Sequence, residues 1–133
     1  MPFPTVKHCM IADAAHAEGA GKLALIGFLG IAPDVEVGIS DFSRPLGLAF
    51  VLLAGDGDGK RYGIQVEVVR EDGTIVMPKS AEALDVELKA GKTILSPHVM
   101  AVYPGPGRYV FRLIVDGQPF YENTFKLLVG QAR

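Results

Sequence analysis

The sequence predicts an all-β protein, an antiparallel β-sandwich of about eight strands. Two observations support this fold class. Short apolar runs follow one another along the 133 residues, separated by glycine, proline and aspartate. Several runs alternate between apolar and polar residues, as in a strand with one buried face. The length suggests a single domain over residues 1–133, and no stretch has the apolar spacing of a confident helix.

Three apolar runs predict strands in the first half of the chain, at residues 6–12, 23–31 and 46–54. The second and third runs are apolar on both faces. Each is therefore expected to be central and covered, or to meet another chain with one face. Residues 13–21 contain glycines that favour a loop, and residues 32–45 are expected to form a polar connection.

The middle of the chain predicts further strands. Residues 61–70 alternate strictly, which predicts a half-buried strand. Asp72 and Gly73 then predict a tight turn into another strand. Residues 92–103 predict a strand broken at Pro97, and a proline within a sheet indicates an edge or a bulge.

Residues 80–91 fit two interpretations. Leu84, Val86 and Leu88 alternate with acidic residues, as in a half-buried strand. Alternatively, Ser80 is suited to cap a helix that Gly91 would end. We favour the strand because the surrounding segments all predict β-structure.

A hairpin is predicted at residues 107–129. Asp116 and Gly117 both tolerate the positive φ of a type I′ turn between its two strands. Tyr109 lies where a tyrosine of an immunoglobulin-like sandwich bonds back to the preceding corner, and Phe111 where the second cysteine of such a domain would be. The alternative is that Tyr109 simply fills the core.

Three segments resemble an uncharacterised family of small bacterial proteins, a domain of unknown function. They are CMIADAA at residues 9–15, GKLALIGFLGIAP at residues 21–33 and GRYVFRLIVDG at residues 107–117. The resemblance implies one immunoglobulin-like β-sandwich over nearly the whole chain and a bacterial, cytoplasmic setting. It implies no catalytic residue.

Composition argues against several classes of function. The net charge is −2 and no basic cluster is present, which argues against nucleic-acid binding. The apolar runs are about half the length of a membrane-spanning helix, and the N-terminus lacks a signal-peptide pattern. Cys9 is the only cysteine, as expected in the reducing cytoplasm. The 49% of hydrophobic residues suggests a surface for self-association.

Metal-ligating residue types gather near the N-terminus. His8, Cys9, Asp13 and His16 lie within nine residues, and His98 is the third histidine. Such side chains are ligands for transition metals. No pair has a recognised ligand spacing, and a buried thiol with surface histidines is the preferred interpretation. We therefore assign no metal or cofactor, and keep metal or small-ligand binding by this His/Asp cluster as the alternative.

Catalytic patterns are weaker still. Ser96 and His98 form the only close serine–histidine pair, and nothing resembles a nucleophile elbow. We assign no catalytic residue and expect the protein not to be an enzyme. The sequence instead predicts a non-catalytic β-sandwich, a binding or structural module that forms a homo-oligomer or binds another protein. The strand face with Val110 and Ile114 is the expected partner surface, because it is too apolar for a solvated face.

Overall fold

The computed structural model describes residues 5–19, 22–55, 59–78, 84–87 and 92–130. Within these ranges every regular element is a strand, which confirms the all-β prediction. The described part contains eleven strands, more than the expected number of about eight. They are β1 (Thr5–Gly19), β2 (Lys22–Ile31), β3 (Glu36–Ile39), β4 (Leu46–Gly55), β5 (Arg61–Arg70), β6 (Ile75–Met77), β7 (Leu84–Glu87), β8 (Lys92–Leu95), β9 (His98–Ala101), β10 (Gly107–Val115) and β11 (Gln118–Val129).

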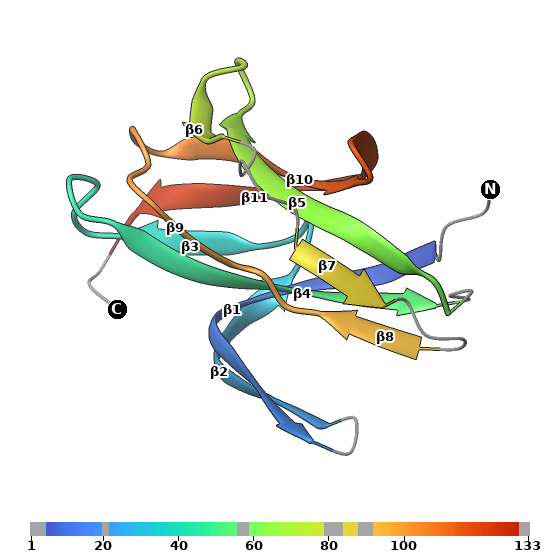
Figure 1. Ribbon diagram of the computed structural model, residues 1–133. Coiled ribbons are helices and arrows are strands. Elements are labelled where there is room, and N and C mark those ends of the chain that lie inside the picture. Colours follow the sequence, from blue (N-terminus) through green and yellow to red (C-terminus); the bar gives the residue numbers. More distant parts are fainter. Residues whose placement is uncertain (1–4, 20–21, 56–58, 79–83, 88–91, 131–133) are drawn as a thin grey trace.

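The strands form two sheets. Sheet A has the order β2-β1-β4-β8, with β9 also paired with β4; sheet B has the order β3-β11-β10-β5-β6, with β7 also paired with β5. The pairs are antiparallel except β3 with β11, which is parallel. In Figure 1 the β1–β2 hairpin extends below the two sheets. Among the described residues, no helix is long and apolar enough to cross a membrane.

The expected loop at residues 13–21 is wrong where the structure describes it. β1 continues to Gly19: its first part, Thr5–Ala12, pairs with β4, and its later part pairs with β2. The glycines favour a loop only locally, and the ladder of hydrogen bonds to β2 overrides that preference. We call residues 13–19 together with β2 the arm.

Three further expectations are corrected or refined. β2 is an edge strand of sheet A and is not central, whereas β4 is central, as predicted. The connection at residues 32–45 contains the short strand β3. The predicted strand at residues 92–103 is two strands, β8 and β9, separated at Pro97 as expected. Of residues 80–91, the structure describes 84–87 and shows the strand β7 there; the remainder lies outside the described residues.

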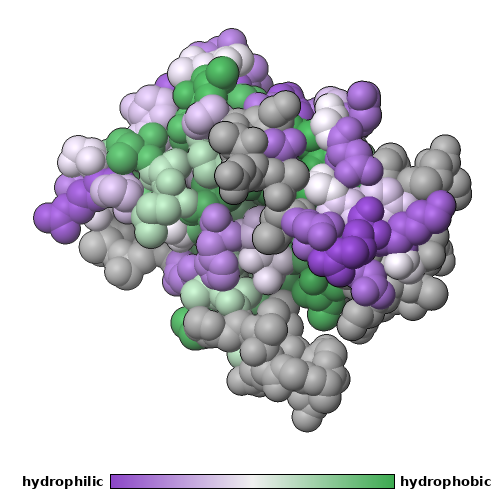
Figure 2. Space-filling model, in the orientation of Figure 1, coloured by the Kyte–Doolittle hydropathy of each residue, from purple (hydrophilic) through white to green (hydrophobic). Residues whose placement is uncertain are grey.

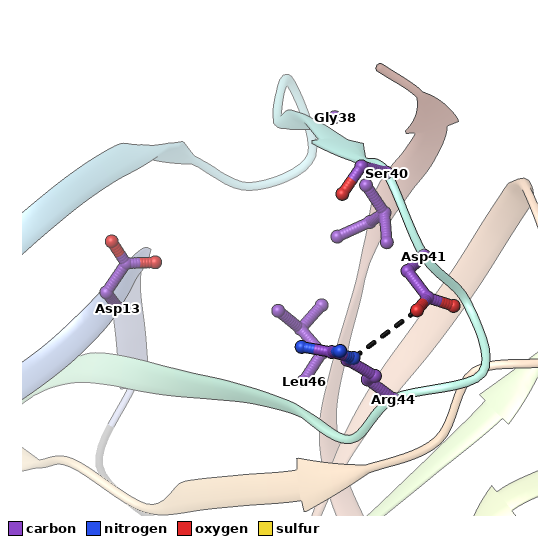
Figure 3. A pocket seen from close by; sticks show the side chains of 7 residues that line it. Asp13, Gly38, Ser40, Asp41, Arg44 and Leu46 are labelled. Atoms are coloured by element: carbon purple, nitrogen blue, oxygen red, sulfur yellow. Dashed lines mark ion pairs between the residues drawn. The ribbon is translucent and has the colours of Figure 1, made fainter. Parts of the chain in front are cut away.

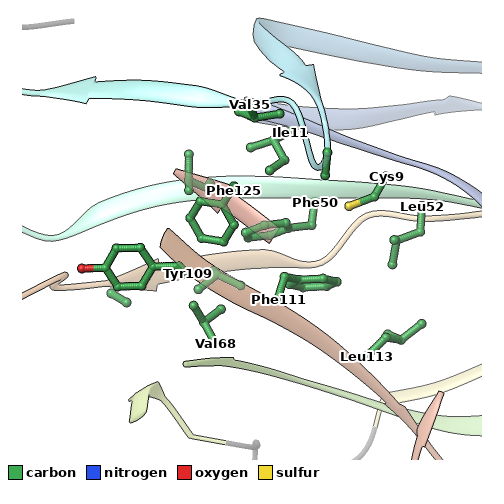
Figure 4. Packing of buried hydrophobic residues seen from close by; sticks show 14 of the residues in the cluster. Cys9, Ile11, Val35, Phe50, Leu52, Val68, Tyr109, Phe111, Leu113 and Phe125 are labelled. Atoms are coloured by element: carbon green, nitrogen blue, oxygen red, sulfur yellow. The ribbon is translucent and has the colours of Figure 1, made fainter. Parts of the chain in front are cut away.

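The main core lies between the two sheets and is organised around aromatic rings (Figure 4). Phe50 of β4 and Phe111 of β10 are fully buried and stack across the sheets, with 4.2 Å between ring centroids and 11° between ring planes. Phe125 of β11 packs against Phe50 at 5.5 Å. The two sheets are therefore joined through aromatic contacts and not through a disulfide, which would need two cysteines.

The hairpin predicted at residues 107–129 is confirmed as β10 and β11. Asp116 and Gly117 have φ values of 48° and 79°, as the type I′ turn requires. Tyr109 fills the core and also bonds back to the preceding turn. Its ring is fully buried, and its hydroxyl donates a hydrogen bond to the carbonyl oxygen of Gly105, four residues upstream.

Candidate interaction surface

Exposed apolar side chains gather on β2, the edge strand of sheet A. Ile26, Phe28 and Ile31 are 52%, 54% and 48% exposed. Figure 2 shows apolar residues at the surface where the arm leaves the two sheets. Scattered exposed apolar residues are ordinary, but several on one unpaired edge indicate an interaction surface.

The opposite side of the arm packs against the outer face of sheet A. Ala15 of the arm is buried in a small second cluster with Ala49 and Val51 of β4. Leu25 of the arm and Ile94 of β8 are partly buried against the same cluster. The arm therefore packs against sheet A at Ala15 and Leu25, while Ile26, Phe28 and Ile31 stay open to solvent.

One close approach and one hydrogen bond shape the base of the arm. Gly27 has φ +65°, and a Cβ at this position would lie 2.1 Å from Oδ2 of Asp13. Only glycine leaves room there for the carboxylate and also adopts this backbone conformation readily. On the other side, the Ala15 amide donates a hydrogen bond of 3.3 Å to Nε2 of His98, which joins the arm to β9.

We expect His98→Ala to loosen the arm selectively. The substitution removes the acceptor for the part-buried Ala15 amide, a loss of about 0.5–1.5 kcal/mol for a typical hydrogen bond. Hydrogen exchange at residues 13–19 should accelerate several-fold, while exchange in β10 stays unchanged. His98→Gln, which retains an acceptor, is the matched control. Unchanged protection of the arm in His98→Ala would show that this bond does not hold it.

A groove of about 520 Å³ opens beside the arm. Figure 3 shows Asp13 on one side of it and the β3–β4 connection on the other. Arg44 and Asp41 form an ion pair of 3.4 Å there, and the Arg44 side chain is 82% exposed. Hydrogen bonds from Ser43 lower the pKa of the Asp41 carboxyl below its usual range. The groove thus carries charges of both signs. The ion pair between Arg44 and Asp41 is exposed, so it contributes little to stability.

The structure places the predicted His/Asp cluster only in part. Cys9 is 1% exposed, which confirms that the thiol is buried, and burial raises its pKa to about 12. His8 and His16 lie on β1, opposite Leu53 and Ala24, with side chains outside the described residues. His98 contacts β1 through its bond to Ala15, between Asp13 and His16, whereas His8 lies farther along the same strand. The described part of the chain contains no group of three potential metal ligands.

Ser96 and His98 have different surroundings in the structure. Ser96 lies in the break between β8 and β9, whereas Nε2 of His98 accepts the hydrogen bond from the Ala15 amide. A general base must reach the proton that it removes. In this structure, Nε2 of His98 is instead the hydrogen-bond acceptor for the Ala15 amide of the arm.

The partner surface expected at Val110 and Ile114 is not supported. Ile114 is 5% exposed, so it offers almost no area for contact. Arg112, which lies between them on the same face, binds Glu67 and also Glu122, the latter at 3.1 Å. These three charged side chains give the outer face of sheet B a polar covering. The apolar edge of β2 replaces it as the candidate surface.

Comparisons with known proteins show only distant likenesses. No protein-family model matches the chain, and no curated protein matches it in sequence. One similar solved structure is the alkylpurine DNA glycosylase AlkC of Pseudomonas fluorescens, bound to DNA containing an abasic site analogue. Its TM-score is 0.44 and its sequence identity is 16%, and the match covers 71% of this chain and 27% of that chain. The PmoD soluble domain from Methylocystis sp. has a TM-score of 0.39 and 14% identity, over 98% of this chain and 94% of that chain. Neither likeness carries an activity or a ligand to this protein.

One prediction is contradicted by these comparisons. The sequence predicts that the protein is not an enzyme, whereas the first of these structures is that of a DNA glycosylase. We therefore withdraw that prediction, together with the description of the module as non-catalytic.

Proposed function

We propose that the protein is a binding or structural module that associates with itself or with another protein through the edge of β2. The observation that carries this proposal is the exposure of Ile26, Phe28 and Ile31 on an edge strand. An edge strand presents unpaired backbone donors and acceptors, and apolar side chains beside them favour contact with a second strand.

We also infer that the fold is an immunoglobulin-like sandwich. Three features support this assignment: the parallel pairing of β3 with the last strand, the back-bond of Tyr109 to Gly105, and the Phe50–Phe111 stack between the sheets. Tyr109 precedes Phe111 by two residues, as the corner tyrosine precedes the second cysteine of antibody domains. An experimental structure in which β3 did not pair with β11 would overturn the assignment.

We also propose that the protein is bacterial and cytoplasmic. The resemblance to the uncharacterised bacterial family and the single buried cysteine support a bacterial protein in the cytoplasm. The net charge of −2 supports a protein partner, and argues against a nucleic acid or a membrane surface.

Sedimentation equilibrium of the full chain over a wide concentration range tests self-association. We expect a concentration-dependent oligomer, and Phe28→Lys should weaken its formation tenfold or more, because a charge would be buried against an apolar strand. Ile75→Lys is the matched control, since Ile75 is 61% exposed on β6 of the other sheet. A chain that stays monomeric throughout would remove self-association from the proposal.

Metal or small-ligand binding by His8, Asp13, His16 and His98 is the second candidate. The observation that favours it is the contact of His98 with Ala15, which brings the third histidine beside the part of β1 that carries Asp13 and His16. Metal analysis of protein purified without a histidine tag, followed by titration with Zn²⁺, tests this candidate. Binding that is lost in His98→Ala would support it; the absence of bound metal and of titratable binding would contradict it.

A further inference from the structure

The orientation of the backbone along β2 follows from a contact on the neighbouring strand. The Ala15 amide points away from β2, because it donates to His98. Ala15 and Leu25 are paired in the antiparallel ladder, so they form a non-hydrogen-bonded pair. In such a pair, the N–H and C=O groups of both residues point outward. Leu25 therefore presents its backbone donor and acceptor to the open edge of sheet A.

Between Leu23 and Ile26, this edge lacks the features that keep edge strands from pairing. Natural edges are protected by charged residues, by prolines, by β-bulges or by short length. β2 has ten residues, and its stretch from Leu23 to Ile31 contains neither a charge nor a proline. Gly27 and Gly30 have positive φ values, and the pairing with β1 shifts register between Phe28 and Gly30 and again between Lys22 and Leu23. The run from Leu23 to Ile26 lies between these irregularities and keeps a regular register with β1.

The charge pattern and the symmetry of the edge favour a second copy of the same chain as its partner. In any antiparallel register within Leu23–Ile31, apolar residues oppose apolar residues, and no like charges meet. In a dimer with a two-fold axis, both β2 strands would pair through their free edges. No free β2 edge would then remain, so the assembly would close at a dimer. A charged strand from a different protein would find no complementary charge on this stretch.

We propose that β2 pairs antiparallel with β2 of a second copy, so that sheet A continues across a two-fold dimer. This proposal rests on the proposed function and specifies its partner and geometry. The hydrogen bonds would come from outward groups such as those of Leu25. Ile26 and Phe28 would supply cross-strand contacts between an aromatic and a β-branched side chain, which stabilise paired strands.

Single-cysteine cross-linking of the full chain tests the geometry. The native Cys9 is buried, so the oxidant has little access to its thiol, and burial also raises the pKa of that thiol. Ala24→Cys, Ile26→Cys and Phe28→Cys are prepared separately and oxidised with diamide. Ile75→Cys and Met100→Cys are controls, because both positions are exposed and apolar but lie on other strands.

We expect one β2 position to form covalent dimer at least tenfold faster than either control, with the rate falling at positions on both sides of it. This pattern marks a two-fold axis, because only residues near the axis approach their own copies within disulfide reach. Comparable cross-linking at all three positions would indicate parallel pairing and overturn the proposal.

Sedimentation of the same variants separates the possible failures. An oligomer that cross-links only at the controls would overturn the β2 pairing while leaving self-association intact. A monomer that no β2 cysteine cross-links would overturn both the β2 pairing and self-association.

Discussion

Replacing Phe50 by alanine should cost about 3–5 kcal/mol in the free energy of unfolding, a large share of the roughly 5–15 kcal/mol that stabilises a typical domain. Phe50 is fully buried on the central strand of sheet A, and its ring stacks on Phe111 of sheet B. Alanine removes the ring that joins the two sheets, and the surrounding strands can collapse into the cavity only in part.

Urea unfolding followed by circular dichroism measures this loss. Phe50→Leu is the matched control and should cost less, because it retains most of the apolar volume. A double-mutant cycle with Phe111→Ala isolates the ring contact, for which we expect a coupling of about 0.5–1.5 kcal/mol. A loss no greater than that of the exposed control Ile75→Ala would show that the stack is not central to stability.

The sequence predicts best the elements whose signals are local. The strict alternation in β5 places Ile64 and Val68 in the core, and both are buried. Asp116 and Gly117 form the predicted turn because their backbone preferences match its φ values. A period of two and a two-residue turn depend only on neighbouring residues, so they can be recognised without knowing the fold.

Elements that depend on distant partners were missed. β3 has only four residues, and it forms because it lies beside β11, from the opposite end of the chain. The arm contains an alanine-rich stretch whose own preferences are weak, and β2 supplies its hydrogen-bonding partner. Strand propensity depends on the position in the sheet, and the sheet order is not encoded in local spacing.

The proposed interaction surface differs from the one that the sequence suggests. The apolar character of residues 23–31 on both faces predicts a central, covered strand or contact with another chain; β2 is not central, and contact with another chain stays a proposal. The choice of Val110 and Ile114 was wrong because the exposure of a side chain depends on its cross-strand neighbours. Arg112 forms ion pairs with Glu67 and Glu122 beside these residues. These ion pairs form only when β5, β10 and β11 are aligned.

Two buried tyrosines should respond in opposite directions to the loss of their hydroxyl groups. Tyr103 and Tyr109 pack edge to face, with 5.0 Å between their ring centroids. The Tyr109 hydroxyl donates to the buried Gly105, whereas the Tyr103 hydroxyl has no hydrogen-bond partner among the described residues. We expect Tyr109→Phe to destabilise the protein by about 1–3 kcal/mol, because a buried acceptor loses its donor. Tyr103→Phe should be neutral or stabilising, because it removes a polar group that is buried without compensation.

The pH dependence of unfolding tests whether the buried Tyr103 hydroxyl, and not a change of packing, causes the effect of Tyr103→Phe. Burial raises the pKa of Tyr103 above its ordinary value of about 10. The unfolded chain therefore ionises first, and the native state loses stability as the pH rises above about 10. Tyr103→Phe abolishes this contribution and should flatten the alkaline decline measured by urea unfolding. An equally steep decline in Tyr103→Phe, or equal destabilisation by both substitutions, would mean that the two hydroxyls differ little in their surroundings.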